Sequence, residues 1–229
     1  MTSASERAAA EWRDSAFVEA WVDRDASRRM LDLPRAIAAA IVASEGEPVR
    51  LVLDVAAGTG VFLAAFLSRF PAATGVWCDG SEAMLRHARA SLAPVAARTD
   101  FILGDMRDLG SIGLSGHADV VVSSRASHHL DDDELYRFYA QCAALVRPGG
   151  WVANLDHVGP ATAWERRYRD ARAEVVGAPP AECAHVHRDP LAGLGTHLDA
   201  LYAAGFVDVD VAWKAFHTAL VMGRTPATR

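Results

Sequence analysis

The sequence from residue 51 to residue 60, L-V-L-D-V-A-A-G-T-G, leaves few choices of fold. It is an apolar, strand-like run followed by a loop with Gly58 and Gly60, and the apolar residues 61–70 then predict a helix. Glycine lets the backbone turn sharply and approach a ligand, and the helix N-terminus offers free N–H groups. The segment therefore predicts the first strand, loop and helix of a parallel α/β sheet.

The alternation of strand and helix continues along the chain. Strands are predicted at 73–78, 101–103, 118–123 and 151–155, a turn at 148–150, and helices at 81–92 and 131–145. Ser81 is expected to cap the first of these helices, and Asp131 the second, with Glu134 at capping-box spacing. Such a pattern predicts a parallel sheet with helices on both faces. Ligands then bind at the carboxyl ends of the strands.

The two ends of the chain are organised differently. Helices are predicted at 6–45, 160–176 and 191–204, a loop at 177–190, and strands at 206–213 and 216–223. Only Lys214 and Ala215 separate the last two strands, so the sheet is expected to finish as an antiparallel hairpin.

Composition limits the classes of partner. The chain has 229 residues, of which 51% are hydrophobic and 23% charged, and this is typical of a globular domain. No apolar run approaches the ~20 residues that span a bilayer, so no membrane partner is expected. The formal net charge of −6 argues against nucleic acid. Three cysteines and no apolar leader segment predict a cytoplasmic protein, as a monomer or a homodimer.

Two further strand ends carry residues that suit a nucleotide. Asp79 lies 19 residues after Gly60, where an acid can accept both hydroxyls of a ribose. In G-D-M at 104–106, Asp105 could accept from an exocyclic amine and Met106 could pack on adenine. The alternatives are a helix-capping role for Asp79 and a turn Asp beside a core Met. The third glycine of the nicotinamide fingerprint is replaced by Leu63, which argues against that cofactor.

Taken in order, L-D-V-A-A-G-T-G, Asp79, G-D-M and the L-V-R-P-G-G before the fifth strand resemble the motifs of the class I S-adenosylmethionine-dependent methyltransferases. The A-G-F at 204–206 and the two closing strands resemble their C-terminal hairpin, so the resemblance covers about residues 48–225. One departure is that Ala56 or Ala57 stands where the family's first motif often has an earlier glycine.

The resemblance implies a Rossmann-like, doubly wound α/β sheet of seven strands in the order 3-2-1-4-5-7-6, with the last strand antiparallel. The sequence as a whole predicts a single domain, 1–229, with an N-terminal helical lid at 1–47, a cofactor-binding half at 48–157, a lid helix and loop at 158–190, and a C-terminal helix and hairpin at 191–229.

The same resemblance implies S-adenosylmethionine as the cofactor. Asp54 and the 58–60 loop would hold its methionine end, Asp79 its ribose, and Asp105 with Met106 its adenine. The backbone around Ser124 and Arg125 would lie beside the sulfonium. The expected cofactor-binding residues are Asp54, Ala56, Ala57, Gly58, Gly60, Asp79, Gly80, Met84, Asp105, Met106, Ser124 and Arg125.

Three histidines are candidates for catalysis. The chain reads S-S-R-A-S-H-H-L after the fourth strand and lacks the [D/N]-P-P-[Y/F] motif of nucleic-acid amino-methylating enzymes. His128 and His129 could supply a base, which is needed where the acceptor begins protonated, or they could close the loop structurally. His157 follows Asp156 at the end of the fifth strand, and only one of these two neighbours is expected to face the pocket.

Aromatic residues outside the nucleotide half predict an acceptor pocket beneath the lid, although core packing is the alternative. The expected lining is Trp12, Trp21, Arg125, Trp164, Tyr168 and His185. Cys183, His185 and His187 occupy alternate positions, but no fourth ligand is evident, so no metal is expected.

The sequence therefore predicts methyl transfer to a small molecule by direct SN2 attack of an oxygen or nitrogen on the sulfonium methyl, in natural product biosynthesis by analogy. Two alternatives stay open. One is a cyclase or rearrangement enzyme with the same cofactor, which product mass would distinguish. The other is a non-catalytic subunit that binds the cofactor, which would not turn over the donor.

Overall fold

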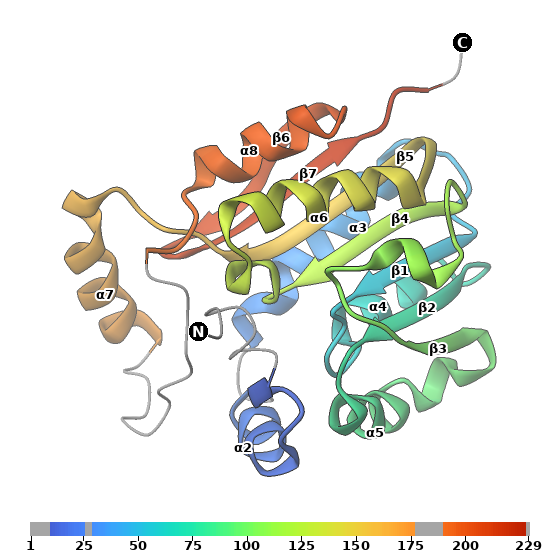
Figure 1. Cartoon of the computed structure of the whole chain (residues 1–229), viewed down its shortest axis with the longest axis horizontal. Coiled ribbons are helices and arrows are strands. Elements are labelled where there is room, and N and C mark those ends of the chain that lie inside the picture. Colours follow the sequence, from blue (N-terminus) through green and yellow to red (C-terminus); the bar gives the residue numbers. More distant parts are fainter. Residues whose placement is uncertain (1–9, 26–28, 177–189, 228–229) are drawn as a thin grey trace.

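Seven strands form one sheet in the order β3-β2-β1-β4-β5-β7-β6 (Figure 1). The structure is a computed structural model that describes residues 10–25, 29–176 and 190–227. The strands are β1 (Leu51–Val55), β2 (Thr74–Asp79), β3 (Thr99–Leu103), β4 (Ala118–Ser124), β5 (Val146–His157), β6 (Val207–Ala215) and β7 (Thr218–Arg224). β1 to β5 pair in parallel, and β7 is antiparallel to both β5 and β6. The predicted strand order and closing hairpin are confirmed.

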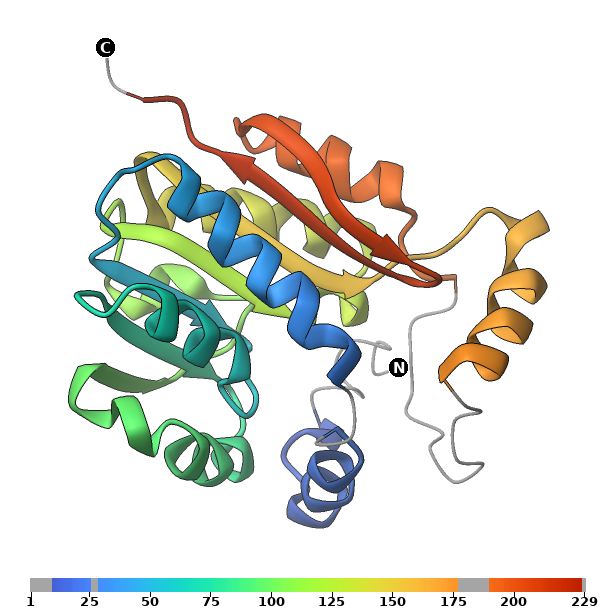
Figure 2. The same cartoon turned by 180° about the vertical axis from the view of Figure 1, so that it is seen from behind.

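Helices cover both faces of the sheet (Figures 1 and 2). On one face lie α3 (Asp32–Ser44), α4 (Val61–Arg69) and α5 (Glu82–Ser91), and on the other lie α6 (Asp132–Leu145) and α8 (Leu194–Ala203). Alternate residues of β4 enter the two cores: Val120 and Val122 join the first, and Val121 joins the second. This alternation explains why the central strand is apolar at successive positions.

The predicted caps of two helices are confirmed. The Ser81 hydroxyl accepts a hydrogen bond from the Met84 backbone N–H at 3.2 Å. Asp131 and Glu134 form a reciprocal capping box at the start of α6. Both caps lie at the carboxyl edge of the sheet, so they fix two helix starts where ligands bind in this class of fold.

The N-terminal region departs from the predicted helical lid at 1–47. Its described residues include the helices α2 (Ser15–Asp25) and α3, with a 3-10 turn, η1 (Arg29–Leu31), before α3. Ala38 and Val42 of α3 are buried in the first core, so α3 belongs to the layer that covers the sheet. In Figure 2, α3 runs across the sheet, whereas α2 lies apart, near the carboxyl edge.

Two turns also differ from their predicted positions. The 148–150 segment belongs to the irregular start of β5, where pairing with β4 shifts register. A Cβ at Gly150 would lie 2.8 Å from the Asp119 carbonyl oxygen, so this close approach requires glycine. The hairpin turns at Phe216 and His217, two residues later than predicted.

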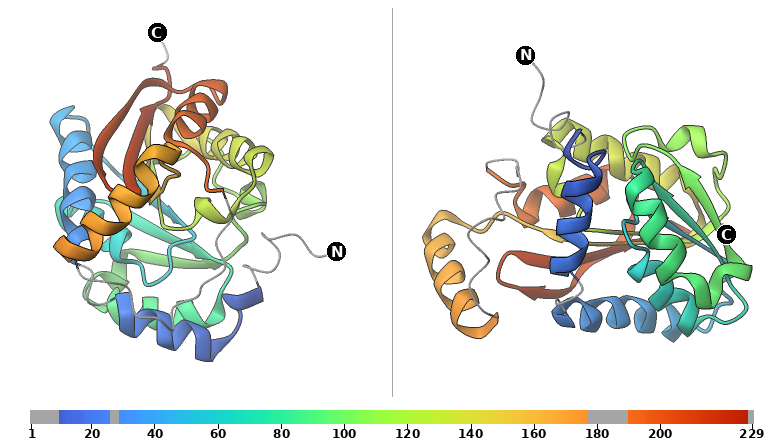
Figure 3. Two further views of the ribbon diagram at one scale, coloured as in Figure 1. Left: turned by 90° about the vertical axis from the view of Figure 1, so that its left-hand side faces the viewer. Right: turned by 90° about the horizontal axis from the view of Figure 1, so that it is seen from below.

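Helix α7 (Thr162–Val176) has no buried residue and projects beyond the closing hairpin (Figure 3). Two of its residues contact the turn: the ring centroid of Tyr168 lies 5.7 Å from that of His217, and Glu165 Oε1 lies 3.4 Å from His217 Nε2. Among the described residues, no helix has the length and apolar character needed to cross a membrane.

Candidate functional site

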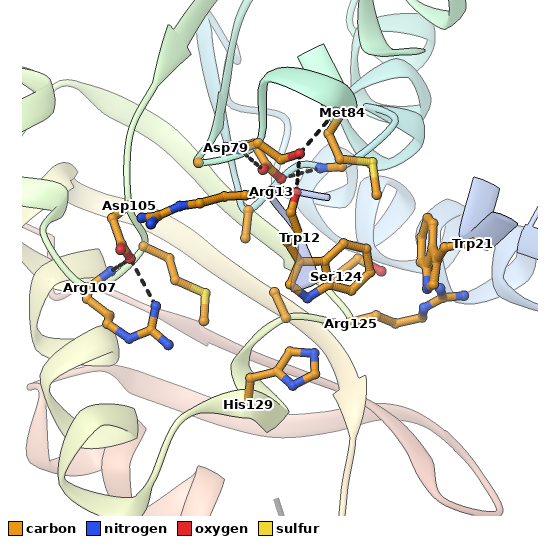
Figure 4. A pocket seen from close by; sticks show the side chains of 16 residues that line it. Trp12, Arg13, Trp21, Asp79, Met84, Asp105, Arg107, Ser124, Arg125 and His129 are labelled. Atoms are coloured by element: carbon orange, nitrogen blue, oxygen red, sulfur yellow. Dashed lines mark hydrogen bonds and ion pairs between the residues drawn. The ribbon is translucent and has the colours of Figure 1, made fainter. Parts of the chain in front are cut away.

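A cavity follows the carboxyl edge of the sheet along the ends of four neighbouring strands (Figure 4). It is bordered by residues that follow β3, β2, β1 and β4, by the start of α5, and by the segment that contains Trp12 and Trp21. The lining includes these predicted cofactor-binding residues: Ala56, Gly58, Asp79, Gly80, Met84, Asp105, Met106, Ser124 and Arg125. The cavity therefore brings together predicted cofactor-binding residues that are up to 69 positions apart, counted from Ala56 to Arg125.

Two backbone N–H groups, one from the loop after β1 and one from the start of α5, hold the carboxylate of Asp79 in place. Its Oδ2 accepts from the Gly58 N–H at 2.8 Å, and its Oδ1 accepts from the Ser81 N–H at 2.8 Å. Burial raises the pKa of this carboxyl to about 6, against the opposing effect of these hydrogen bonds. The negative charge of Asp105 raises the pKa further. A carboxylate oxygen can accept more than one hydrogen bond, so Asp79 can still receive two ligand hydroxyls.

The two glycines of the first loop have different roles. Gly58 has φ +52°, and an added Cβ would meet nothing closer than the Met84 sulfur at 4.0 Å, because the position faces the cavity. Its carbonyl accepts from the Trp77 indole N–H at 2.9 Å. Gly60 has φ +78°, and an added Cβ would lie 2.6 Å from Leu92 Cδ1. Gly58 thus borders the cavity, whereas Gly60 allows close packing of α4 and α5.

Asp54 lies behind the cavity lining, as do Ala57 and Gly60. Its Oδ2 accepts from the Leu63 N–H at 3.0 Å, in the first turn of α4. Gly60 precedes this helix and has no side chain to cap it, so Asp54 supplies the cap from β1. Burial raises the pKa of Asp54. In the structure, Asp54 therefore braces the loop and the start of α4.

Arg107 is a cavity residue that the sequence reasoning did not single out. Its Nη1 lies 3.3 Å from Asp105 Oδ1, and its Nε lies 3.3 Å from Glu134 Oε1. The Asp105 carboxylate also accepts from the Arg107 backbone N–H at 2.9 Å. These contacts orient Asp105 at the end of β3 and tie the G-D-M loop to the start of α6.

The three candidate histidines lie next to one another. The rings of His128 and His129 have centroids 4.0 Å apart, and those of His128 and His157 lie 4.9 Å apart. His129 lines the cavity, whereas His128 and His157 do not. His157 Nδ1 lies 3.3 Å from the hydroxyl of Thr218 on β7. The structure thus separates one histidine at the cavity from two behind it.

The carboxylate of Asp156 holds the loop that carries His128 and His129. Its Oδ1 lies 2.6 Å from His128 Nδ1, and its Oδ2 accepts from the Ala126 N–H, the Ser127 hydroxyl and the His128 N–H at 3.0, 2.6 and 3.2 Å. Burial raises the pKa of Asp156, but the charge of His128 and the hydrogen bond from it prevail and hold the pKa below its usual range. Asp156 is therefore ionised at the centre of the loop.

A second layer of buried polar groups supports this loop. The Asn154 amide donates to the Ser127 hydroxyl at 2.8 Å and to the Tyr139 hydroxyl at 2.8 Å. The Tyr139 hydroxyl lies 2.9 Å from His197 Nδ1 on α8. Sequence reasoning missed this network. Its signal is the pair of polar residues, Asn154 and Asp156, at alternate positions of an otherwise apolar strand.

The aromatic candidates divide into two groups. Trp12 and Trp21 line the cavity with ring centroids 5.3 Å apart, and the Ser81 hydroxyl donates to the Trp12 carbonyl at 2.6 Å. Trp164 and Tyr168 lie on α7 and are not among the described residues of the lining, so the structure does not bring them to this cavity, and their role in acceptor binding stays a prediction. The physical reason is that α7 projects beyond the hairpin and does not fold over the sheet edge.

The predicted candidates Cys183, His185 and His187 lie outside the described residues. Within the part of the chain that the structure describes, no three His, Cys, Asp or Glu side chains are grouped as a metal site requires.

Residues 52–150 match the family described as a methyltransferase domain. This match covers all the strand ends of the cavity, and the observed strand order is the one that the family resemblance implied. Residues 52–150 therefore form a methyltransferase domain similar to those of the class I S-adenosylmethionine-dependent methyltransferases.

Two curated methyltransferases and one solved structure illustrate the similarity. Malonyl-[acyl-carrier protein] O-methyltransferase of Methylococcus capsulatus is 34% identical over 122 residues, which are 53% of this chain and 42% of that protein. Trans-aconitate 2-methyltransferase of Deinococcus radiodurans is 36% identical over 115 residues, 48% of this chain and 41% of that protein. An O-methyltransferase family protein from Burkholderia thailandensis has the same fold, with a TM-score of 0.71 and 22% identity over 94% of this chain and 61% of that one. The chain therefore spans about two fifths of the length of these curated relatives.

S-adenosylmethionine is the cofactor of this family, and the cavity fits it. Gly58 leaves open the space that a Cβ would enter, and Asp79 presents two carboxylate oxygens beside that space. Met106 and Met84 give apolar surface near Asp105, as a purine with an exocyclic amine requires. The cavity thus presents the polar and apolar groups that an adenosine requires, and Asp54 supports the loop behind them.

Proposed function

We propose that this methyltransferase transfers the methyl group of S-adenosylmethionine to an oxygen or nitrogen of a small-molecule acceptor. The observation that carries the proposal is one continuous cavity. It joins Asp79, Asp105 and Gly58, which suit adenosine, to His129 and the two indoles of Trp12 and Trp21. When bound, the cofactor supplies an activated methyl on a sulfonium, so the protein's task is to align a nucleophile and exclude water.

The donor side of the cavity follows the strand order. Asp105 and Met106 at β3 would take adenine, Asp79 at β2 would accept the ribose hydroxyls, and Ala56 and Gly58 at β1 would lie along the methionine end. The next strand in the sheet is β4, so the loop after β4 would face the methyl group. This order supports an acceptor position beside Arg125 and His129.

His129 is the residue that we propose as the base for an acceptor that begins protonated. It lines the cavity, and its ring lies against that of His128. His128 Nδ1 lies 2.6 Å from Oδ1 of the ionised Asp156, so Nδ1 carries a proton that it donates to this carboxylate. His128 and Asp156 would then hold the loop and the orientation of His129, in the way that a carboxylate orients a catalytic histidine.

The names of two relatives specify polar acceptors. They specify a malonyl group on a carrier protein and trans-aconitate as the groups on which those enzymes act. For this methyltransferase we propose a small molecule, because Trp12 and Trp21 enclose the acceptor side of the cavity. A role in natural product biosynthesis is part of the proposal and rests on analogy alone.

The first test is calorimetric titration of the protein with S-adenosylhomocysteine, with NAD as the control. We expect saturable binding of S-adenosylhomocysteine alone. Incubation with S-adenosylmethionine and a panel of phenols, carboxylic acids and amines should then yield a product heavier by one CH₂ unit. A product of unchanged mass would indicate a cyclase or rearrangement. Binding of neither nucleotide would overturn the proposal.

A further inference from the structure

We propose that Arg125 binds a carboxylate of the methyl acceptor, so that the substrate class is an organic acid. The inference rests on the proposed function, because it takes the donor to lie along the ends of β3, β2 and β1. Arg125 follows β4, one strand farther along the same cavity. Its side chain therefore lies on the side of the cavity that the donor leaves to the acceptor.

The backbone of Arg125 is held in an unusual conformation. Its φ is +55°, in the left-handed region that residues with a side chain rarely adopt. The Arg125 N–H donates to the Leu155 carbonyl at 3.0 Å, and the following residue, Ala126, donates to Asp156. Strained residues persist where the surroundings fix them, and they cluster at ligand-binding sites. The hydrogen bonds around Asp156 thus set the direction in which Arg125 leaves the loop.

The guanidinium of Arg125 is also fixed at its far end. It lies 4.6 Å from the ring centroid of Trp21, and the side chain is only 8% exposed (Figure 4). A guanidinium held by an aromatic ring loses little further freedom when it binds a ligand. Its planar fork matches both oxygens of a carboxylate. A buried cation on a cavity wall therefore favours an anionic ligand of this geometry.

The neighbouring Ser124 provides a second polar group. Ser124 lines the cavity, and its hydroxyl is buried with no hydrogen-bond partner among the residues that the structure describes. Buried hydroxyls usually have a partner, so this one is available to a ligand oxygen beside Arg125.

A carboxylate could also come from the donor itself, whose methionine end carries one. The experiment must therefore separate the two sources. The probes are benzoate and its uncharged amide, benzamide, titrated into protein with and without saturating S-adenosylhomocysteine. Benzoate suits the indoles of Trp12 and Trp21, and benzamide has the same shape without the charge. The variants are Arg125→Gln and Arg125→Lys, with Arg166→Gln as the control.

Arg166 is a matched control because it lies on α7 with its side chain 82% exposed. We expect the wild type and Arg166→Gln to bind benzoate at least tenfold more tightly than benzamide. In Arg125→Gln this preference should disappear, while affinity for S-adenosylhomocysteine stays within twofold. Arg125→Lys keeps the charge without the fork and should show an intermediate preference. It also provides the test if Arg125→Gln does not fold.

Three results would overturn the inference. One is equal or undetectable binding of benzoate and benzamide by the wild type. Another is a benzoate preference that survives in Arg125→Gln. The third is a loss of S-adenosylhomocysteine affinity in Arg125→Gln with unchanged affinity for methylthioadenosine, because that would assign Arg125 to the donor's carboxylate. Failure of the wild type to bind S-adenosylhomocysteine would instead overturn the proposed function. In that case, the benzoate and benzamide titrations in the absence of S-adenosylhomocysteine would still decide whether Arg125 binds a carboxylate.

Discussion

Replacing Asp156 by Asn should weaken both the fold and the acceptor side of the cavity. The carboxylate accepts from four donors of the 126–128 loop, and its Oδ1 also accepts from the His157 N–H at 2.7 Å. An amide keeps one accepting oxygen and turns the other position into a donor, which would face the His157 N–H. A buried donor without an acceptor costs about 1–3 kcal/mol, and breaking a buried ion pair costs about 3–5 kcal/mol. We therefore expect a loss of about 3–5 kcal/mol in the free energy of unfolding.

Urea unfolding followed by circular dichroism measures this loss, with Asp119→Asn as the matched control. Asp119 is also buried and accepts from the Arg50 and Leu51 N–H groups at 2.7 and 2.9 Å, but it lies at the amino edge of the sheet. Both variants should lose stability, whereas only Asp156→Asn should lower kcat and raise the KM for the acceptor. A loss below about 1 kcal/mol, or kinetics equal to those of Asp119→Asn, would refute the role assigned to Asp156.

Three further predictions concern the donor side and the base. Ribose hydroxyls donate to the ionised form of Asp79, so affinity for S-adenosylhomocysteine should fall by up to tenfold per pH unit as the pH drops through about 6, and Asp79→Asn should abolish this dependence in calorimetry. Gly60→Ala should lower the free energy of unfolding by about 1–3 kcal/mol, measured in urea, because its Cβ would overlap Leu92 at a backbone φ of +78°. His129→Gln should reduce kcat about 10²–10⁴-fold for an acceptor that must lose a proton, and it should remove the acidic limb of the pH–rate profile with little change in donor affinity.

The sheet and its strand order could be predicted because the apolar pattern of each strand agrees with its packing in the folded chain. The run of valines in β4 indicates a strand buried on both faces, and the structure places alternate valines in the two cores. Asp79 and Gly58 follow strands at neighbouring positions in the sheet, so their meeting in one cavity could be inferred from topology. Their contacts with the cofactor remain predictions.

The remaining features depend on contacts that leave little trace in the sequence. Asp54 has the position of a ligand residue, yet the N-terminus of α4 takes up its carboxylate, because Gly60 cannot cap that helix. Trp164 has the character of a pocket residue, but no pattern in α7 shows that the helix projects away from the sheet edge. The hairpin turn is displaced because Phe216, not Lys214 or Ala215, adopts a positive φ of 51°.

The proposed acceptor side of the cavity is assembled from segments that are far apart in the chain, and this explains why the sequence predicts the methyl donor more readily than the acceptor. Trp12 and Trp21 come from the N-terminal segment, Arg125 and His129 from the loop after β4, and their support, Asp156, from β5. The donor residues each follow one strand at a motif spacing, whereas these groups share no spacing at all. A change in any one segment can alter the acceptor without touching the adenosine contacts. Substrate choice should therefore respond to Arg125 while donor affinity does not.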